Sequence, residues 1–309
     1  METENDVKQY FETYRYAEEY GSEEDGWALL AARQLYDETG EEPYASFIRK
    51  YFELFVTQNG DMEDKSAGTD TAGKIHAGRC LFFLYQNTGE EKYRKAIETL
   101  MNCLRTYFES AGGCAASDGQ PEDADMETLY RTAPFYMEYE TVYDKKEKYQ
   151  DIIKRFECAQ EIFSNGKKDR CCMSAAQYLA ALVDTMDCMS IEIYEQYRKL
   201  QDMFKLALGD VLRYRDRESG LFPRTFGPED QGGSETDLCG SALIGYCILK
   251  ACRMGIVLRE KYIDTGMEVV EKLVADMEEQ IKKGGRMPET QILLMAYGQY
   301  LHVKNRSEE

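Results

Sequence analysis

The chain is 309 residues long, which is enough for one large domain or two smaller ones. It carries 57 acidic and 38 basic residues, a formal net charge of −19, so its surface repels nucleic-acid backbones and anionic membranes. Hydrophobic residues make up 43% of the sequence and prolines number only 6, a composition typical of an ordered protein rich in helices.

The start of the chain and its cysteines indicate a cytoplasmic protein. Residues 1–10 lack the basic and apolar regions of a secretory signal, and no apolar run approaches the roughly 20 residues of a membrane span. The 10 cysteines are then expected as reduced thiols. With only two histidines, His76 and His302, and no CxxC pair, we expect no metal site, and no motif indicates a cofactor.

A repeated segment organises the chain. Residues 35–44 read Leu-Tyr-Asp-Glu-Thr-Gly-Glu-Glu-Pro-Tyr, and residues 84–93 repeat them as Leu-Tyr-Gln-Asn-Thr-Gly-Glu-Glu-Lys-Tyr. Weaker copies lie at 142–149 and 254–262, and a degraded copy lies near 189–197. In the full copies a glycine follows a helix, where a left-handed residue ends it, and acidic residues open the next helix. The repeat therefore predicts tight turns between paired helices.

The apolar periodicity predicts about twelve helices. In chain order they span residues 5–20, 26–38, 42–57, 73–88, 90–108, 124–143, 146–163, 171–187, 190–215, 236–254, 259–281 and 288–304. The short turns pair the second helix with the third, the fourth with the fifth, and so on, which leaves the last helix to pair with the first. Six hairpins in a ring make an all-α fold, an (α/α)6 barrel of six inner and six outer helices. We expect a single domain over residues 1–309.

Short and long connections alternate, so all the long loops are expected at one rim, together with the N-termini of the inner helices. A site on such a barrel is built from these loops and helix starts. The sequence places the following residues at that rim: Trp27, Asp70, Lys74, His76, Asp125, Glu127, Tyr130, Arg131, Cys172, Ser174, Arg224, Glu235, Asp237, Glu289 and Gln291. Carboxylates gathered there suit general acid/base chemistry on a glycosidic or enol-ether bond.

Several of these residues also have a structural interpretation. The carboxylates that precede or open helices suit N-capping: Asp125, Glu127, Glu235 and Asp237. His76 is more simply a core or rim histidine than half of a metal pair with Cys80. Arg224 either binds a substrate carboxylate bidentately or pairs with an acidic neighbour. Pro134 is expected to kink its helix.

Three segments carry a resemblance to a known family. Residues 127–135 read Glu-Thr-Leu-Tyr-Arg-Thr-Ala-Pro-Phe, residues 216–222 read Asp-Arg-Glu-Ser-Gly-Leu-Phe, and residues 293–297 read Leu-Leu-Met-Ala-Tyr. Together with the six hairpins and the repeated turn, they resemble glycoside hydrolase family 88/105, the unsaturated glucuronyl and rhamnogalacturonyl hydrolases. The resemblance runs over nearly the whole chain, from about residue 27 to residue 300.

The resemblance implies a cytoplasmic enzyme that acts on small oligosaccharides with a non-reducing unsaturated uronic acid. In the family an aspartic acid protonates the C4–C5 enol ether and directs water, and the hemiketal then collapses to release the neighbouring sugar. The family motif Asp-Gly-Leu-Tyr-Met falls on residues 127–131, so the acid/base position is Glu127. The candidate catalytic residues are therefore Glu127 and Asp125, and the candidate substrate-binding residues are Trp27, Asp70, His76, Tyr130, Arg131, Arg224 and Asp237.

This sequence departs from the family pattern at other positions. A second family carboxylate falls at Gly73, where Asp70 and His76 are the nearest substitutes. The family histidine after Gly-Leu-Phe is represented by Pro223 or Arg224. A family stretch with Trp and Arg is replaced by Glu-Thr-Asp-Leu-Cys-Gly at residues 235–240. The scaffold therefore resembles the family more closely than the site does.

These departures leave two other functions open. One is a non-catalytic carbohydrate-binding or regulatory protein on the same barrel, and the other is a different enzyme such as a sugar epimerase, for which His76 is the one histidine at the rim. A hydrolase predicts that Glu127 points into the cup of the barrel with a raised pKa. A binding protein predicts that Glu127 caps its own helix or pairs with Arg131.

Overall fold

The computed structural model describes residues 2–63, 70–110, 126–165, 170–227, 235–282 and 290–307. Within these ranges the chain forms twelve α-helices, a short 3-10 helix and two short strands. The helices are α1 (Glu2–Thr13), α2 (Glu23–Thr39), α3 (Glu42–Phe55), α4 (Thr71–Thr88), α5 (Glu91–Ser110), α6 (Met126–Val142), α7 (Tyr149–Asn165), α8 (Cys172–Asp187), α9 (Tyr194–Val211), η2 (Leu212–Tyr214), α10 (Leu238–Arg253), α11 (Arg259–Lys282) and α12 (Thr290–Ser307). The strands β1 (Arg170–Cys171) and β2 (Thr225–Phe226) pair antiparallel.

The predicted helices agree with the observed ones within a few residues, except at the end of α1. That helix was expected to reach residue 20, and this prediction is wrong, because α1 ends at Thr13. The segment that follows bonds to α2 instead of continuing the helix. The Tyr14 hydroxyl and the Ala17 N–H donate to the Asp25 carboxylate over 2.9 and 3.1 Å. The two strands were not predicted, since each is only two residues long.

The predicted hairpin turns are confirmed at both full copies of the repeat. Gly40 and Gly89 follow α2 and α4 in left-handed conformations, with φ of 66° and 68°. In the fourth copy Gly255 has a φ of 69°. The third copy has no glycine, and there Lys145 and Lys146 adopt φ of 55° and 70°. Two lysines therefore take the left-handed conformation there, against the steric preference of a side chain, and the connection between α6 and α7 is longer than the turns at Gly40 and Gly89.

The contacts along the chain divide it into two compact units. Unit 1 comprises Met1–Thr106 and Val274–Glu309, and unit 2 comprises Tyr107–Leu273. The single domain over residues 1–309 stays a prediction. The boundaries between the units fall within α5 and α11.

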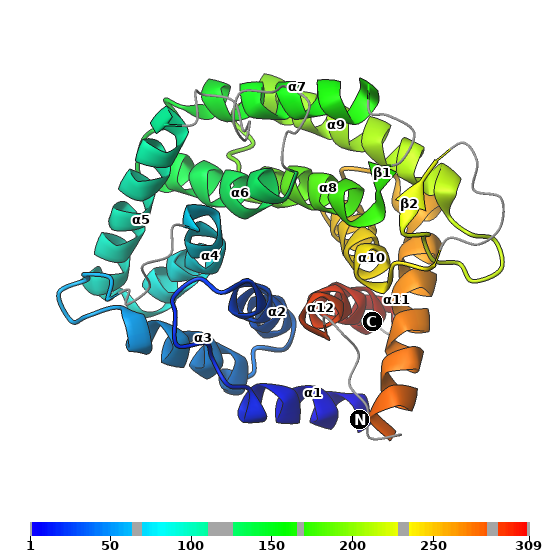
Figure 1. Ribbon diagram of the computed structural model, residues 1–309, viewed down its shortest axis with the longest axis horizontal. Helices are drawn as coiled ribbons and strands as arrows, with labels where there is room; N and C mark the ends of the chain where they lie inside the picture. Colours follow the sequence, from blue (N-terminus) through cyan, green and yellow to red (C-terminus); the bar gives the residue numbers. More distant parts are fainter. Residues whose placement is uncertain are drawn as a thin grey trace. The chain divides into compact units, whose positions relative to one another are not determined.

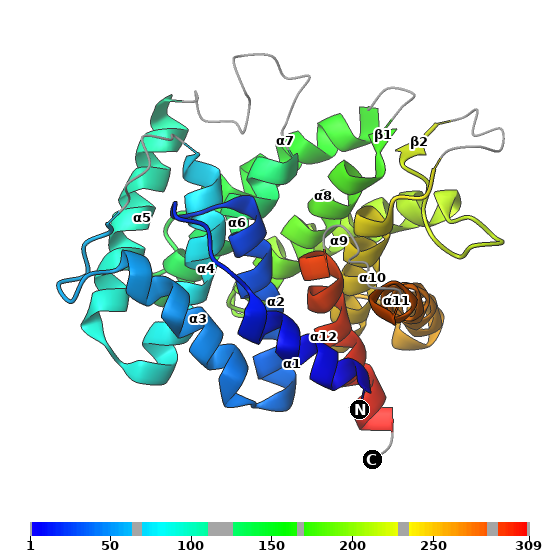
Figure 2. The same ribbon diagram turned by 60° about the horizontal axis from the view of Figure 1, so that its bottom comes forward.

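In unit 1 the last helix lies alongside the first long one. Helices α12 and α2 run side by side in the same direction (Figures 1 and 2). Gly298 packs against Gln34, and about one turn further along both helices the His302 Nδ1 atom lies 2.7 Å from Glu38 Oε2. Since both pairs advance together, the two N-termini lie at the same end, as the alternation of loops predicted.

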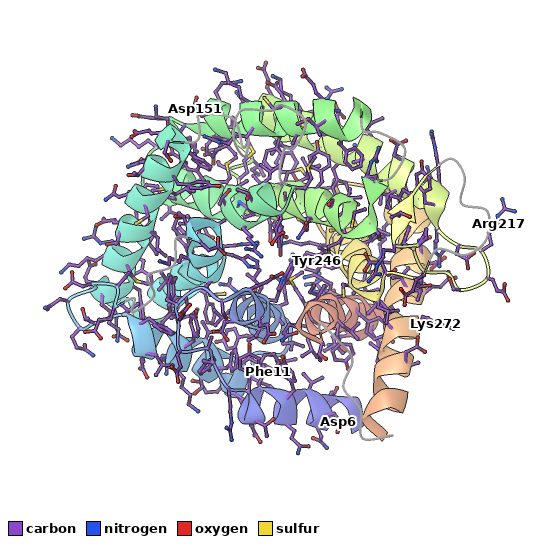
Figure 3. The ribbon with its side chains drawn as sticks, in the orientation of Figure 1. Asp6, Phe11, Asp151, Arg217, Tyr246 and Lys272 are labelled. Carbon is purple, nitrogen blue, oxygen red and sulfur yellow. The ribbon has the colours of Figure 1, made fainter. Side chains whose placement is uncertain are left out.

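An aromatic layer joins the outer helices of unit 1. Phe11 of α1, labelled in Figure 3, contacts two rings of α3. The ring centroid of Phe11 lies 5.5 Å from that of Tyr44 and 4.9 Å from that of Phe47, and both pairs have edge-to-face geometry. Aromatic pairs of this kind add to the free energy of burial. Helices α1 and α3 thus form a common outer layer.

In unit 2 inner and outer helices differ in burial. Helices α7 and α9 cover α6 and α8 on one side (Figure 1). In α8 and in α10, 13 of 16 residues are buried, against 6 of 18 in α9. Helices α8 and α10 are parallel, because Cys172 lies against Gly240 near their starts and Asp184 bonds to Lys250 near their ends. This confirms the predicted alternation for these helices.

A cluster of charges with a buried centre joins the ends of α8 and α10. The Lys250 Nζ atom lies 2.8 Å from both Asp184 Oδ1 and Asp187 Oδ2, and the hydroxyl of Tyr246, labelled in Figure 3, donates to Asp184 over 2.7 Å. Lys250 is 3% exposed and Asp184 1%. Burial acts against the charge on Lys250, but the two carboxylates outweigh it and raise its pKa. These four residues form the Lys250 cluster, in which Lys250, Asp184 and Tyr246 are buried and the Asp187 side chain is 41% exposed.

Candidate functional site

The helix starts of unit 1 are fixed by short polar side chains. The Ser22 hydroxyl accepts from the Asp25 N–H over 3.2 Å at the start of α2, and Asp70 Oδ1 accepts from the Gly73 N–H over 3.0 Å at the start of α4. These bonds satisfy N–H groups that have no partner within the helix. Asp70 is thus an N-cap, and its part in substrate binding stays a prediction.

Trp27 and His76 lie against each other in unit 1. Their ring centroids are 5.1 Å apart and the rings are nearly perpendicular, at 81°. Trp27 is 4% exposed and His76 1%. A Cβ atom at Gly26 would stand 2.6 Å from His76 Nδ1, so α2 and α4 approach closely at this point. This burial agrees with the interpretation of His76 as a core histidine, and substrate binding by either ring stays a prediction.

Asp25 is a buried carboxylate that sequence reasoning missed. It is 1% exposed, and its two oxygens accept from the Tyr14 hydroxyl and the Ala17 N–H. Burial raises the pKa of Asp25, although the hydrogen bonds to the carboxylate act in the opposite direction. Ser22 three residues before an acidic residue has the spacing of a helix cap, which is the signal that could have found it. Asp25 fastens the segment between α1 and α2.

Glu127 and Arg131 lie one turn apart at the start of α6 in unit 2. Their side chains form an ion pair, in which the Glu127 side chain is 38% exposed and that of Arg131 10%. Pairing at this spacing is favourable on a helix, since residues four apart share a face. This pairing is the arrangement expected if the chain is a non-catalytic binding protein. Glu127 nevertheless keeps more than a third of its side chain open to water.

Two further candidates belong to the same part of the chain. Tyr130 is fully buried, so its ring contributes to the core of unit 2. Asp125, the second candidate catalytic residue, lies outside the described residues. Helix α6 continues through Pro134 to Val142. Of the residues predicted on α6, Glu127 is therefore the one carboxylate that the structure describes at the helix start.

Arg224 is an exposed cation on a fixed backbone. Its N–H donates to the Glu235 carbonyl over 2.8 Å, and its own carbonyl accepts from the Cys172 N–H over 2.9 Å. The side chain is 69% exposed, and its guanidinium lies 3.4 Å from the Glu235 carboxylate. Pairing with an acidic neighbour, one of the two interpretations, is thus observed. Binding of a substrate carboxylate stays a prediction.

Asp237 is an N-cap, as its structural interpretation predicted. The Gly240 N–H donates to Asp237 Oδ1 over 2.8 Å at the start of α10. Gly240 is also a point of close approach, because a Cβ atom there would stand 2.5 Å from Cys172 Sγ. Burial raises the pKa of the Cys172 thiol. Cys172 therefore packs as a neutral thiol, which is a poor nucleophile.

Two kinds of feature are missing from the described ranges. No helix within them is both long and apolar enough to cross a membrane. No group of three His, Cys, Asp or Glu side chains within them has an arrangement that could hold a metal ion. The described candidates include two ion pairs, Glu127–Arg131 and Arg224–Glu235.

The sequence profile of Glycosyl Hydrolase Family 88 matches residues 2–170 and 163–306. The chain belongs to this family. The family 88 chain is also similar to solved structures. A family 105 glycoside hydrolase from C. acetobutylicum has a TM-score of 0.76 and 16% identity, with 99% of each chain covered. A family 88 glycosyl hydrolase from Bacteroides vulgatus has a TM-score of 0.73 and 12% identity, with 99% of this chain and 97% of that one covered.

An unsaturated glucuronyl hydrolase from Bacillus sp. GL1, described as responsible for the degradation of glycosaminoglycan, has a TM-score of 0.59 and 12% identity. The match covers 99% of this chain and 94% of the Bacillus chain. At these identities the structures show the fold, which is the six-hairpin (α/α)6 barrel that the sequence predicted. Family and fold together indicate a glycoside hydrolase of the family 88/105 type.

Proposed function

We propose that this family 88 chain hydrolyses small oligosaccharides whose non-reducing end is an unsaturated uronic acid. The observation that carries the proposal is Glu127, a partly exposed carboxylate in the first turn of α6 with the Arg131 guanidinium beside it. A carboxyl group can transfer the proton, and a guanidinium can bind the uronate. The name of the Bacillus relative, an unsaturated glucuronyl hydrolase, supports the same class of substrate.

In this proposal Glu127 is the general acid and then the general base. Its carboxyl proton moves to C4 of the C4–C5 double bond, and its carboxylate then takes a proton from the water that adds to C5. The product is a hemiketal at C5. Opening of the hemiketal leaves a hemiacetal at C1, and its collapse releases the neighbouring sugar. One water molecule is consumed and Glu127 regains its proton.

Arg131 and Arg224 are the two cations proposed for the uronate. Each is paired with a carboxylate of the chain, Glu127 and Glu235 respectively. The exposed Arg224 pair resembles a surface ion pair, which contributes little to stability and is easily exchanged. We place the activity in the cytoplasm, because all nine cysteines of the described part are thiols.

The second candidate function is a non-catalytic carbohydrate-binding protein on the same barrel. The Glu127–Arg131 pair favours it, since a carboxylate held by a guanidinium is an anion and not a proton donor. Both candidates predict that the chain binds anionic sugars. They differ in whether the sugar is cleaved.

A turnover assay on a panel of unsaturated disaccharides made by polysaccharide lyases separates the two. Hydration removes the C4–C5 double bond, so the hydrolase predicts loss of its ultraviolet absorbance and release of the neighbouring sugar. A flat trace over the whole panel, with the protein folded by circular dichroism and a sugar bound, contradicts the hydrolase and supports the binding protein. Saturated disaccharides of the same composition serve as controls and should give no signal.

A further inference from the structure

In the Glu127–Arg131 pair, the Arg131 guanidinium binds a carboxylate of the chain itself. A guanidinium offers a planar fork of N–H donors that matches a carboxylate. In the free chain Glu127 occupies that fork. Both residues lie in the first two turns of α6, where the helix dipole favours negative charge, whether it comes from the chain or from a ligand.

The two partners differ in their access to water. The Arg131 side chain is 10% exposed, whereas that of Glu127 is 38% exposed. The guanidinium is therefore held by its surroundings, and the carboxylate is at the solvent side of the pair. Ion pairs four residues apart on a helix are also weak. Glu127 is thus the partner that can move away while Arg131 stays in place.

We infer that an anionic sugar replaces Glu127 on Arg131 when it binds. The inference rests on the proposed function, because it takes a uronate as the ligand. The exchange keeps a carboxylate beside the Arg131 guanidinium throughout, which offsets the cost of sheltering its charge from water. A neutral sugar has no charge with which to make this exchange. Arg131 is then the residue that determines specificity for anionic over neutral sugars.

The exchange also changes the chemistry of Glu127. Once it is released from the guanidinium and set beside the carboxylate of the ligand, it binds a proton more readily, because attraction to a cation is replaced by repulsion from an anion. A protonated Glu127 is the general acid that hydration of the double bond requires. An ion pair that opposes catalysis in the free chain is therefore compatible with catalysis in the complex.

Binding of glucuronate tests the exchange without turnover, by NMR titration with methyl glucoside as the neutral comparison. Glu127→Gln removes the internal competitor and keeps the shape of the side chain, so it should bind glucuronate about 2- to 3-fold more tightly than the parent. Arg131→Met should bind glucuronate about 10-fold or more weakly. Methyl glucoside should bind all three proteins alike.

Arg198→Met is the matched control. Arg198 pairs with Asp202 at the same spacing on α9, and both side chains are 64% exposed. This variant should bind glucuronate as the parent does. Equal, weaker or undetectable glucuronate binding by Glu127→Gln overturns the exchange, and this result does not depend on whether Arg131→Met folds.

Failure of the exchange can be told apart from failure of the proposed function. If Glu127→Gln gains affinity while the parent cleaves no disaccharide of the panel, the exchange is supported and the chain is a binding protein for anionic sugars. If the parent cleaves a disaccharide while Glu127→Gln gains no affinity for glucuronate, the hydrolase is supported and the exchange is overturned.

Discussion

Two groups of charges in unit 2 share the same chemistry and differ in exposure. In the Lys250 cluster the central pair is sealed, with Lys250 3% and Asp184 1% exposed, and Asp187 at its edge is 41% exposed. The side chains of Glu127 and Arg131 are 38% and 10% exposed. A sealed pair cannot lose a partner without leaving a charge in a medium that does not solvate it. An open pair can exchange a partner for water or for a ligand. We therefore expect the buried Lys250–Asp184 pair to contribute to stability, and the Glu127–Arg131 pair to be available for exchange with a ligand.

Lys250→Met is the change with the largest expected effect on stability. It removes the cation that pairs with the buried Asp184, and removing one partner of a buried ion pair costs about 3–5 kcal/mol. Asp187 is 41% exposed and keeps Arg253 3.7 Å away, so it adds little to this cost. The free energy of unfolding from urea titrations measures the loss. Lys199→Met, which breaks an exposed pair with Glu157, is the control and should cost less than about 1 kcal/mol. Equal losses in the two variants would contradict the distinction between sealed and open pairs.

Gly240→Ala tests the close approach of α10 to α8 at Gly240 and Cys172. The new Cβ atom would stand 2.5 Å from Cys172 Sγ, and overpacking of this kind costs about 1–3 kcal/mol of unfolding free energy. Cys172→Ala in the same chain should recover part of that loss, because the two atoms no longer meet.

Gly209→Ala is the matched control for this change. Gly209 lies within α9, where no heavy atom of the described part falls within 4 Å of a Cβ atom. Alanine in a helix is favoured over glycine, so this variant should gain about 0.5–1 kcal/mol. Destabilisation at Gly209 as large as that at Gly240 would show that the contact with Cys172 is not the cause.

Asp25→Asn extends the comparison to a sealed carboxylate in unit 1. Because burial raises the pKa of Asp25, the native chain binds its proton more tightly than the unfolded chain does. The stability of the parent relative to Asp25→Asn should therefore fall as the pH rises from about 3.9, the ordinary aspartate value, until the folded-state carboxyl is ionised. Unfolding at a series of pH values measures this difference, and a difference that rises with pH over that window would contradict the assignment.

Glu127→Gln should have the smallest effect on stability. An open pair of this spacing contributes about 0.3–0.5 kcal/mol, so the unfolding free energy should stay within about 0.5 kcal/mol of the parent. Urea titrations beside Lys250→Met give the direct contrast. A loss of about 2 kcal/mol or more would place this pair with the sealed ones.

Local signals allowed most of the fold to be predicted from the sequence. The period of the apolar residues predicted the helices, and the glycines at 40 and 89 predicted the ends of α2 and α4. The end of α1 could not be predicted in this way, because Asp25, eight residues beyond Ala17, draws the chain out of the helix. The strands β1 and β2 depend on hydrogen bonds between segments far apart in the sequence.

The candidate site was less predictable, because burial and pairing depend on neighbouring helices. The Glu127–Arg131 pair follows from its spacing on one helix, and the sequence offered it as an alternative. The burial of Trp27 and His76 does not follow from spacing, since it results from the contact of α2 with α4. Asp237 was correctly interpreted as a cap, because the N-cap position is a local feature.

The measurement that tests the central claim most directly is single-turnover cleavage of an unsaturated disaccharide by Glu127→Gln beside the parent. General acid catalysis is worth about 100- to 10,000-fold. We therefore predict a rate loss of that size in a variant that remains folded and binds glucuronate at least as tightly as the parent. Cleavage by Glu127→Gln at the rate of the parent would contradict the assignment of Glu127 as the acid.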